Sequence, residues 1–142
     1  MPDRTKTLTE LEGQEWGEPD YPSHLVVTCH QMRNKPIGEL TDGEIRMAIG
    51  QQFSLPILVP LALERLEQNP LLEADFYEGD LWKFVLMAKP DFWNEHPDLW
   101  QHASRISERA WMEAEGMDES WQQNIKPDLK ETYAAFLLRK PG

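Results

Sequence analysis

Apolar residues recur at helical spacing along this chain, in segments that prolines separate from one another. The segment after Pro127 is an example, with apolar residues at offsets 0, 4, 7 and 8: Leu129, Tyr133, Phe136 and Leu137. Such offsets place side chains on one face of an α-helix. No stretch alternates convincingly between apolar and polar residues, as a half-buried strand would. The pattern therefore predicts an all-α fold.

Six segments carry this helical pattern, and start and stop signals bound them. The predicted helices cover residues 23–35, 41–53, 54–69, 80–89, 97–116 and 127 onward. Thr41 and Glu44 form a capping box, and Asp80 is predicted to cap the fourth helix. Pro60 is predicted either to kink the third helix or to mark its true start. The expected architecture is a compact single-domain bundle of about six helices with short, proline-marked connections.

The length of 142 residues suits one domain, and a hydrophobic content of 40% suffices for a packed core. Residues 54–69 are apolar nearly all round and are expected to form the most buried helix. Residues 1–22 lack an apolar stripe and are predicted to form an acidic N-terminal arm, loosely ordered or packed on the core. Residues 23–142 are predicted to form the single helical domain.

Twenty-five acidic residues against 14 lysines and arginines give a formal net charge of −11. This balance argues against non-specific nucleic-acid binding and against an anionic membrane surface, because both depend on basic residues. A basic protein partner stays open. No apolar run approaches the ~20 residues that cross a bilayer, and the N-terminus shows no apolar signal core. With Cys29 as the one cysteine, these features lead us to expect a cytoplasmic protein.

The negative charge is concentrated in two short stretches. Residues 1–20 hold six acidic residues and two basic ones, and residues 70–80 hold four acidic residues and no basic one, so each stretch carries −4. Runs of acidic residues are most often solvated faces or tails. The alternative is a binding surface for a basic partner, which aromatic residues within both stretches favour. Core-like spacing predicts that Trp100 and Trp111 are packed, whereas Trp16, Trp93 and Trp121 are expected to be partly exposed.

The sequence lacks the motifs that carry catalysis, metals or cofactors. It has no glycine-rich phosphate loop, no H-E-x-x-H and no G-x-S-x-G. His24 and His30 do not share a helix face, and Cys29 falls on the apolar face of its predicted helix. Two carboxylates could still converge in the fold, which keeps an enzyme as a minor alternative. We therefore assign no catalytic, cofactor-binding or metal-binding residues.

Several spaced blocks between residues 29 and 93 resemble a known family. They are Lys35-Pro36, Ile49-Gly50-Gln51, Pro60-Leu61-Ala62-Leu63-Glu64 and Asp75-Phe76-Tyr77-Glu78-Gly79-Asp80-Leu81, with a similar lead-in at residues 11–17. The sequence resembles the immunity proteins of bacterial contact-dependent growth inhibition systems, over about half to two-thirds of the chain. The recurrent blocks look like fold devices, with Gly50 allowing a close helix approach. Residues after about 100 have no part in the likeness.

The resemblance implies a cytoplasmic binding protein without catalytic activity. It would capture, as a 1:1 complex, the C-terminal toxin domain of a large surface exoprotein, and such toxins are commonly nucleases. No cofactor, nucleic acid or membrane is expected to take part. The predicted toxin-binding residues are Glu12, Glu15 and Trp16 in the arm, with Glu73, Asp75, Tyr77 and Glu78 in the second acidic stretch. The alternative is a helical adaptor that binds an endogenous basic protein.

Overall fold

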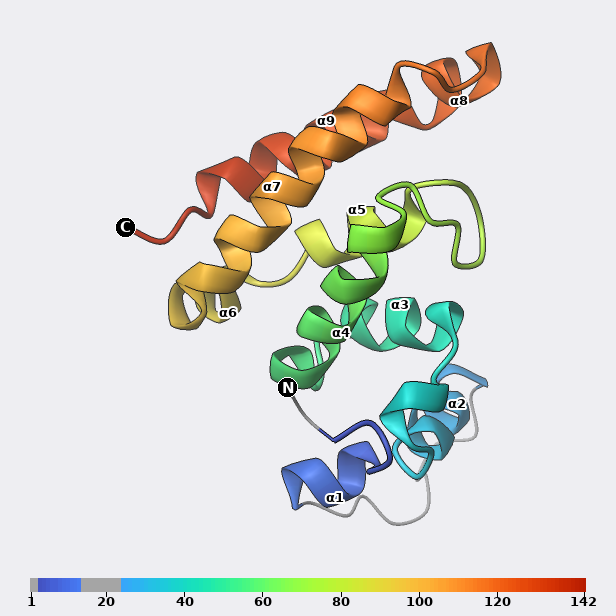
Figure 1. The fold of residues 1–142 in the computed structure, drawn as a ribbon, viewed down its shortest axis with the longest axis vertical. Helices are drawn as coiled ribbons and strands as arrows, with labels where there is room; N and C mark the ends of the chain where they lie inside the picture. The colour runs from blue at the N-terminus through green and yellow to red at the C-terminus, as the bar shows by residue number, and fades with distance from the viewer. Residues whose placement is uncertain (1–2, 14–23) are drawn as a thin grey trace.

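The computed structural model describes residues 3–13 and 24–142, which form a stack of helices (Figure 1). The elements are α1 (Leu8–Glu12), α2 (His24–Met32), the 3-10 helix η1 (Ile37–Glu39), α3 (Asp42–Gly50), α4 (Leu55–Gln68), α5 (Asp80–Leu86), α6 (Pro90–Glu95), α7 (Pro97–Ala114), α8 (Glu119–Asn124) and α9 (Lys126–Leu138). Within the described ranges no strand occurs, and two isolated bridges pair extended backbone. The predicted all-α fold is confirmed.

The six predicted helices correspond to α2, α3, α4, α5, α7 and α9. The capping box of α3 is confirmed, because the Glu44 amide donates to Thr41 Oγ1 and the Thr41 amide donates to the Glu44 carboxylate. Pro60 lies inside α4, which begins at Leu55. The prediction that Pro60 could mark the start of this helix is therefore wrong, because Pro56 already occupies the first turn, where a missing N–H costs nothing.

Three short helices, α1, α6 and α8, were not predicted as separate elements. Helix α1 has its own capping box from Thr7 and Glu10 and ends at Gly13, which has a left-handed φ of 66°. A five-residue helix is too short to show an apolar stripe, but its Leu8 is fully buried and attaches it to the core. The division into an arm over residues 1–22 and a helical domain over residues 23–142 stays a prediction.

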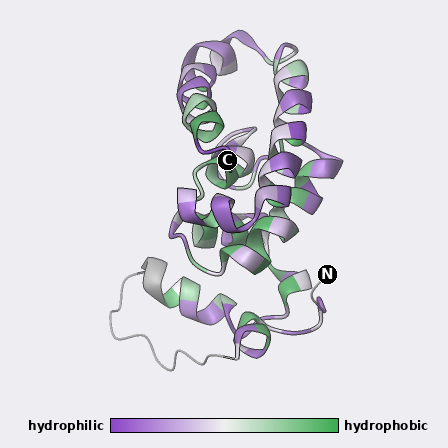
Figure 2. Cartoon of the chain, turned by 90° about the vertical axis from the view of Figure 1, so that its left-hand side faces the viewer, coloured by the Kyte–Doolittle hydropathy of each residue, from purple (hydrophilic) through white to green (hydrophobic). Residues whose placement is uncertain are grey.

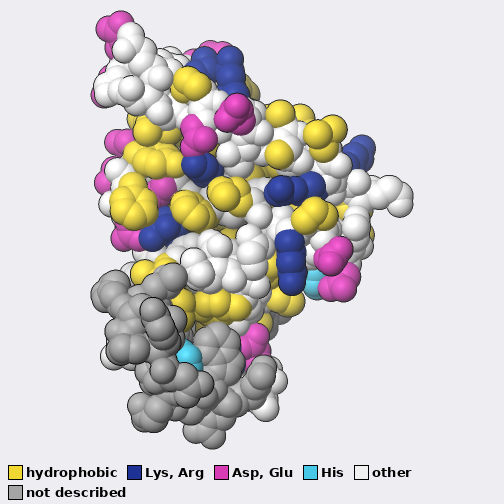
Figure 3. All heavy atoms as spheres, turned by 180° about the vertical axis from the view of Figure 1, so that it is seen from behind, with side chains coloured by type: hydrophobic (Ala, Val, Ile, Leu, Met, Phe, Trp, Pro, Cys, Tyr) yellow, Lys and Arg dark blue, Asp and Glu magenta, His cyan; other side chains and the backbone are white. Residues whose placement is uncertain are grey.

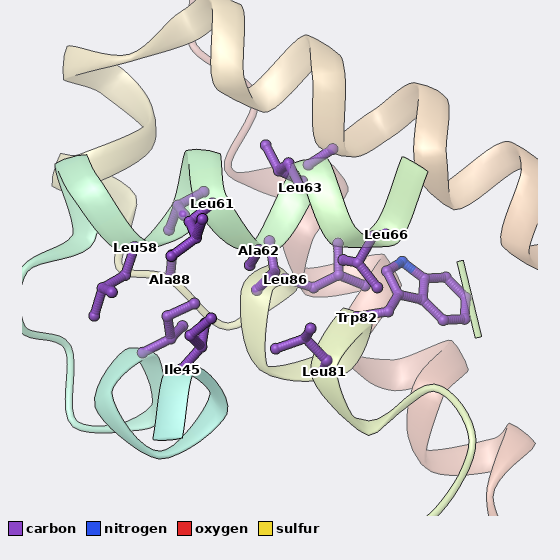
Figure 4. Packing of buried hydrophobic residues seen from close by; sticks show 14 of the residues in the cluster. Ile45, Leu58, Leu61, Ala62, Leu63, Leu66, Leu81, Trp82, Leu86 and Ala88 are labelled. Atoms are coloured by element: carbon purple, nitrogen blue, oxygen red, sulfur yellow. The ribbon is translucent and has the colours of Figure 1, made fainter. Parts of the chain in front are cut away.

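Helix α4 is the centre of the fold, as its apolar sequence predicts. Its buried residues are Leu55, Leu58, Val59, Leu61, Ala62, Leu63 and Leu66. One side of α4 packs on α3 and α5, and the other packs on α7. Figure 4 shows Ile45, Leu81 and Leu86 facing the first side, while Leu63 points toward α7. Figure 2 shows hydrophobic and hydrophilic residues alternating along the helices, with hydrophobic residues in the helices at the middle of the molecule.

Helices α3 and α5 approach each other closely at Gly50. A Cβ atom on Gly50 would lie 3.0 Å from Cδ1 and from Cε1 of the Phe84 ring, which is shorter than ordinary van der Waals contact. Glycine at this position therefore lets the two helices pack, as the family resemblance implied. This packing matters for the site below, because the segment that leads into α5 lies against α3.

An aromatic cluster joins α6, α7 and α9 around Phe136. The fully buried Phe136 ring stacks on Trp100 with 4.9 Å between centroids and meets Trp93 edge-on at 5.4 Å. Trp93 is 0% exposed and Trp121 is 4% exposed, so the expectation that they are partly exposed is wrong. Their short helices, α6 and α8, turn both indoles inward, which the irregular spacing of these segments did not reveal. Trp16 lies outside the described residues.

Candidate functional site

Residues 70–79 join α4 to α5 and are called the acidic connector below. The Asp80 carboxylate, which is 0% exposed, holds its middle in place. Oδ1 of Asp80 accepts the Ala74 N–H at 2.7 Å, and Oδ2 accepts the N–H groups of Asp75 and Phe76 at 2.9 Å each. Hydrogen bonds to an ionised acceptor are stronger than neutral ones, so one buried side chain fixes three successive residues.

The prediction that Asp80 caps α5 is wrong. Gly79 occupies the N-cap position with a left-handed φ of 97°, and no side chain caps this helix. Asp80 is instead the first residue of α5, and its carboxylate turns back to accept amides of the connector. An acidic residue at a helix start is favoured by the helix dipole whichever amides it accepts, so the sequence alone does not distinguish the two roles.

Arg46 of α3 binds the connector from a second direction. Its Nε donates to Asp75 Oδ2 at 2.9 Å, and its Cζ lies 4.6 Å from the centroid of the Phe76 ring and 4.9 Å from that of Phe84. Arg46 is only 9% exposed, so solvent screens these interactions less than it would at the surface. A Cβ atom on Gly43 would lie 2.5 Å from Asp75 Oδ1, and glycine there leaves room for the carboxylate.

Helices α5, α8 and α9 hold the C-terminal part of the connector. The indole Nε1 of Trp121 donates to the Glu78 carbonyl at 2.8 Å. The Tyr77 hydroxyl interacts with Lys83, whose ammonium group also forms an ion pair with Asp128. Burial raises the pKa of Tyr77, although the neighbouring Lys83 charge opposes that shift. The connector is thus attached by Asp80, by Arg46 and by residues of the C-terminal helices.

The attached connector exposes one aromatic ring and two carboxylates on the same loop. Phe76 is 67% exposed, and Glu73 and Glu78 are both exposed. The Glu73–Glu78 backbone bridge closes the loop, so these two residues lie next to each other at its base. Within residues 3–13 and 24–142, neither carboxylate has an ion-pair partner. Hydrophobic and acidic side chains lie side by side at the left-hand edge of Figure 3, at the height of the connector.

Glu12, the predicted arm residue that the structure describes, does not lie at this surface. The Glu12 carboxylate accepts hydrogen bonds from Arg33 and from Ser54, so it ties α1 to α2 and to the start of α4. Figure 1 places α1 at one end of the stack, away from the connector beside α5. Glu15 and Trp16 lie outside the described residues. Of the predicted residues, the structure therefore groups Glu73, Asp75, Tyr77 and Glu78.

Phe76 and Arg46 were not among the predicted site residues. The signal for Phe76 was an aromatic pair inside an acidic run, from which Tyr77 was chosen although it is the less exposed of the two. Arg46 gave no signal, because its partner Asp75 is 29 residues further along the chain. Pairings at that separation depend on how α3 and α5 pack.

Among the described residues, the other chemistry-bearing groups form no second site. The described part of the chain holds no group of three or more histidine, cysteine or acidic residues that could bind a metal ion. Cys29 is buried, and burial raises the pKa of its thiol, as expected for a core residue. A shallow hollow of about 310 Å³ lies beside α6, with Asp91 and Glu95 at its border. No helix in the described ranges is long and apolar enough to cross a membrane.

Comparison with known proteins assigns the family. A family model described as CDI immunity proteins matches residues 10–103, a span that runs from α1 through the connector into α7. No curated protein and no solved structure matches the chain. The family match includes all four connector residues predicted from the sequence and leaves out the second half of α7 with α8 and α9. Because the match covers well over half of the chain, this protein belongs to the family of CDI immunity proteins.

Proposed function

We propose that this protein neutralises the C-terminal toxin domain of a contact-dependent growth inhibition exoprotein, by binding it in a 1:1 complex through the acidic connector. Membership of the CDI immunity proteins implies a cognate toxin partner. The observation that carries the choice of surface is the fixed connector, with an exposed Phe76 and with the carboxylates of Glu73 and Glu78, which have no ion-pair partner among residues 3–13 and 24–142. Binding takes place in the cytosol of the cell that makes the immunity protein.

Electrostatics supports a nuclease as the toxin. A nuclease needs positive surface to hold phosphates, and a chain with a net charge of −11 attracts such a surface at long range. Complementary charge speeds association up to about 10⁸–10⁹ M⁻¹s⁻¹ at low salt. Fast capture suits an immunity protein, since a toxin molecule that escapes acts catalytically. Inhibition follows when the connector covers the active-site cleft or the surface next to it.

Reversing two connector charges should slow capture of the toxin. The double variant Glu73→Lys with Glu78→Lys raises the net charge from −11 to −7 and leaves the contacts of Asp80 and Arg46 in place. We expect the association rate constant at low salt to fall about tenfold or more, and the difference from wild type to shrink as salt rises. Stopped-flow fluorescence with the cognate toxin domain measures this rate.

A matched control separates local charge from net charge. The variant Asp91→Lys with Glu95→Lys makes the same change in net charge on α6, at the border of the hollow and away from the connector (Figure 1). It should retain an association rate within about threefold of wild type. Equal slowing by both double variants would assign the effect to net charge alone. If only the α6 variant associates more slowly, the binding surface is the hollow and not the connector.

A further inference from the structure

We infer that Phe76 is the apolar anchor of this surface, and that the toxin carries an apolar recess bordered by lysines or arginines to receive it. The inference rests on the proposed function, because it names the chemistry of the toxin face that meets the connector. It adds a residue that neither the family match nor the charge pattern singles out.

The exposure of Phe76 sets it apart from the other large apolar side chains. In the described ranges, those with substantial exposure are Phe76, Met87, Met112, Leu137 and Leu138. Phe76 is the one aromatic residue in this set, and it alone lies on the acidic connector. Aromatic side chains bury a large area on binding and lose few rotamers, so they are enriched among the residues that dominate interface energies.

The backbone and the ring of Phe76 are both fixed before any partner binds. Its N–H donates to Asp80 Oδ2 at 2.9 Å, and the Arg46 guanidinium lies 4.6 Å from the centroid of its ring. The ring nevertheless stays 67% exposed, so the stack covers only part of it. A side chain that is already ordered loses little conformational entropy on binding, which leaves more of the contact energy as affinity.

The charges around Phe76 identify the partner. Glu73 and Glu78 provide exposed carboxylates on the same loop, so the surface has an apolar centre and an acidic border. Interfaces commonly place an apolar anchor at the centre and polar groups at the rim. The matching face is an apolar recess with a basic border. A second copy of this chain fits poorly, because it would bring a net charge of −11 against the same charge.

The test compares Phe76→Ala with Met112→Ala, which removes a side chain that is 74% exposed on α7. Binding of the purified cognate toxin domain is followed by surface plasmon resonance. We expect the complex of Phe76→Ala to dissociate about 30-fold faster or more than that of wild type, and to associate within about threefold of the wild-type rate. A 30-fold change corresponds to an anchor that contributes about 2 kcal/mol, at about 1.4 kcal/mol for each factor of ten. Met112→Ala should dissociate at the wild-type rate.

The outcomes separate this inference from the proposed function. If the Glu73→Lys, Glu78→Lys variant associates slowly while Phe76→Ala dissociates at the wild-type rate, the surface is correct and the anchor is wrong. If wild type itself does not bind the toxin domain, the proposed function fails. Phe76→Ala should unfold at the same urea midpoint as wild type, since the side chain is exposed. If wild type forms a dimer and Phe76→Ala is monomeric, the ring serves self-association and the inference is overturned.

Discussion

Replacing Asp80 with alanine should destabilise the protein by about 3 kcal/mol. The substitution removes one buried carboxylate that accepts the N–H groups of Ala74, Asp75 and Phe76. A hydrogen bond to a charged group contributes about 1.5–3 kcal/mol, and a buried donor left without a partner costs about 1–3 kcal/mol. Once the connector loosens, its three freed N–H groups can donate to water. The total loss of stability therefore stays below the sum of three separate hydrogen-bond losses. Urea unfolding monitored by circular dichroism measures the change.

The chain offers a matched control for this carboxylate. Asp118 accepts a single amide, that of Trp121, as the N-cap of α8. Loss of one such cap costs about 1 kcal/mol, so Asp118→Ala should be clearly milder. Hydrogen exchange at residues 74–76 should accelerate in Asp80→Ala and stay unchanged in Asp118→Ala. Equal losses of stability in the two variants, or unchanged exchange at the connector, would show that Asp80 does not organise it.

The second large effect is expected from Phe136→Ala, which should lower the free energy of unfolding by about 3–5 kcal/mol. Phe136 is fully buried, and its ring contacts Trp93, Trp100 and Tyr133. Its removal leaves a cavity that rigid indole rings cannot fill by small movements. The near-ultraviolet circular dichroism of the tryptophans should weaken as well, because their asymmetric packing is lost. Thermal and urea unfolding give the free energy.

Leu138→Ala is the control for Phe136→Ala, since it lies on the same helix and is 89% exposed. It should change the free energy of unfolding by no more than about 0.5 kcal/mol. Unchanged stability in both variants would mean that α9 is stabilised by its helical propensity and not by packing on α6 and α7, because alanine has the highest helix propensity. The difference between the two variants therefore measures how firmly the C-terminal helices join the rest of the fold.

Much of the fold follows from local patterns in the sequence. Prolines and caps act over a few residues, so the start of α4 beside Pro56 and the capping box of Thr41 with Glu44 could be predicted. The central place of α4 follows from its apolar residues, which cover most of its circumference. The helices α1, α6 and α8 are one or two turns long and carry no measurable period, so the same approach missed them.

The site depends on contacts between distant parts of the chain, and these limited its prediction. The acidic run and its aromatic residues placed Glu73 and Glu78 correctly in one segment. Asp80 was predicted to cap a helix because it stands at the start of an apolar helical segment. Its amide partners lie upstream in the connector and not in the helix. Glu12 looked free for a partner, but its ion pair with Arg33 spans 21 residues. Trp121 was predicted to be partly exposed, but α8 brings its indole to the carbonyl of Glu78, which is 43 residues away in the chain.

The central claim is that the acidic connector meets the toxin, and hydrogen–deuterium exchange of the unmodified proteins tests it most directly. The exchange of this chain is measured alone and in complex with its cognate toxin domain. The account predicts slower exchange in the complex over residues 72–79 and over the neighbouring α8, with little change in α6. Protection confined to α1, to α6 or to the hollow between α6 and the start of α4, with the connector unchanged, would contradict it.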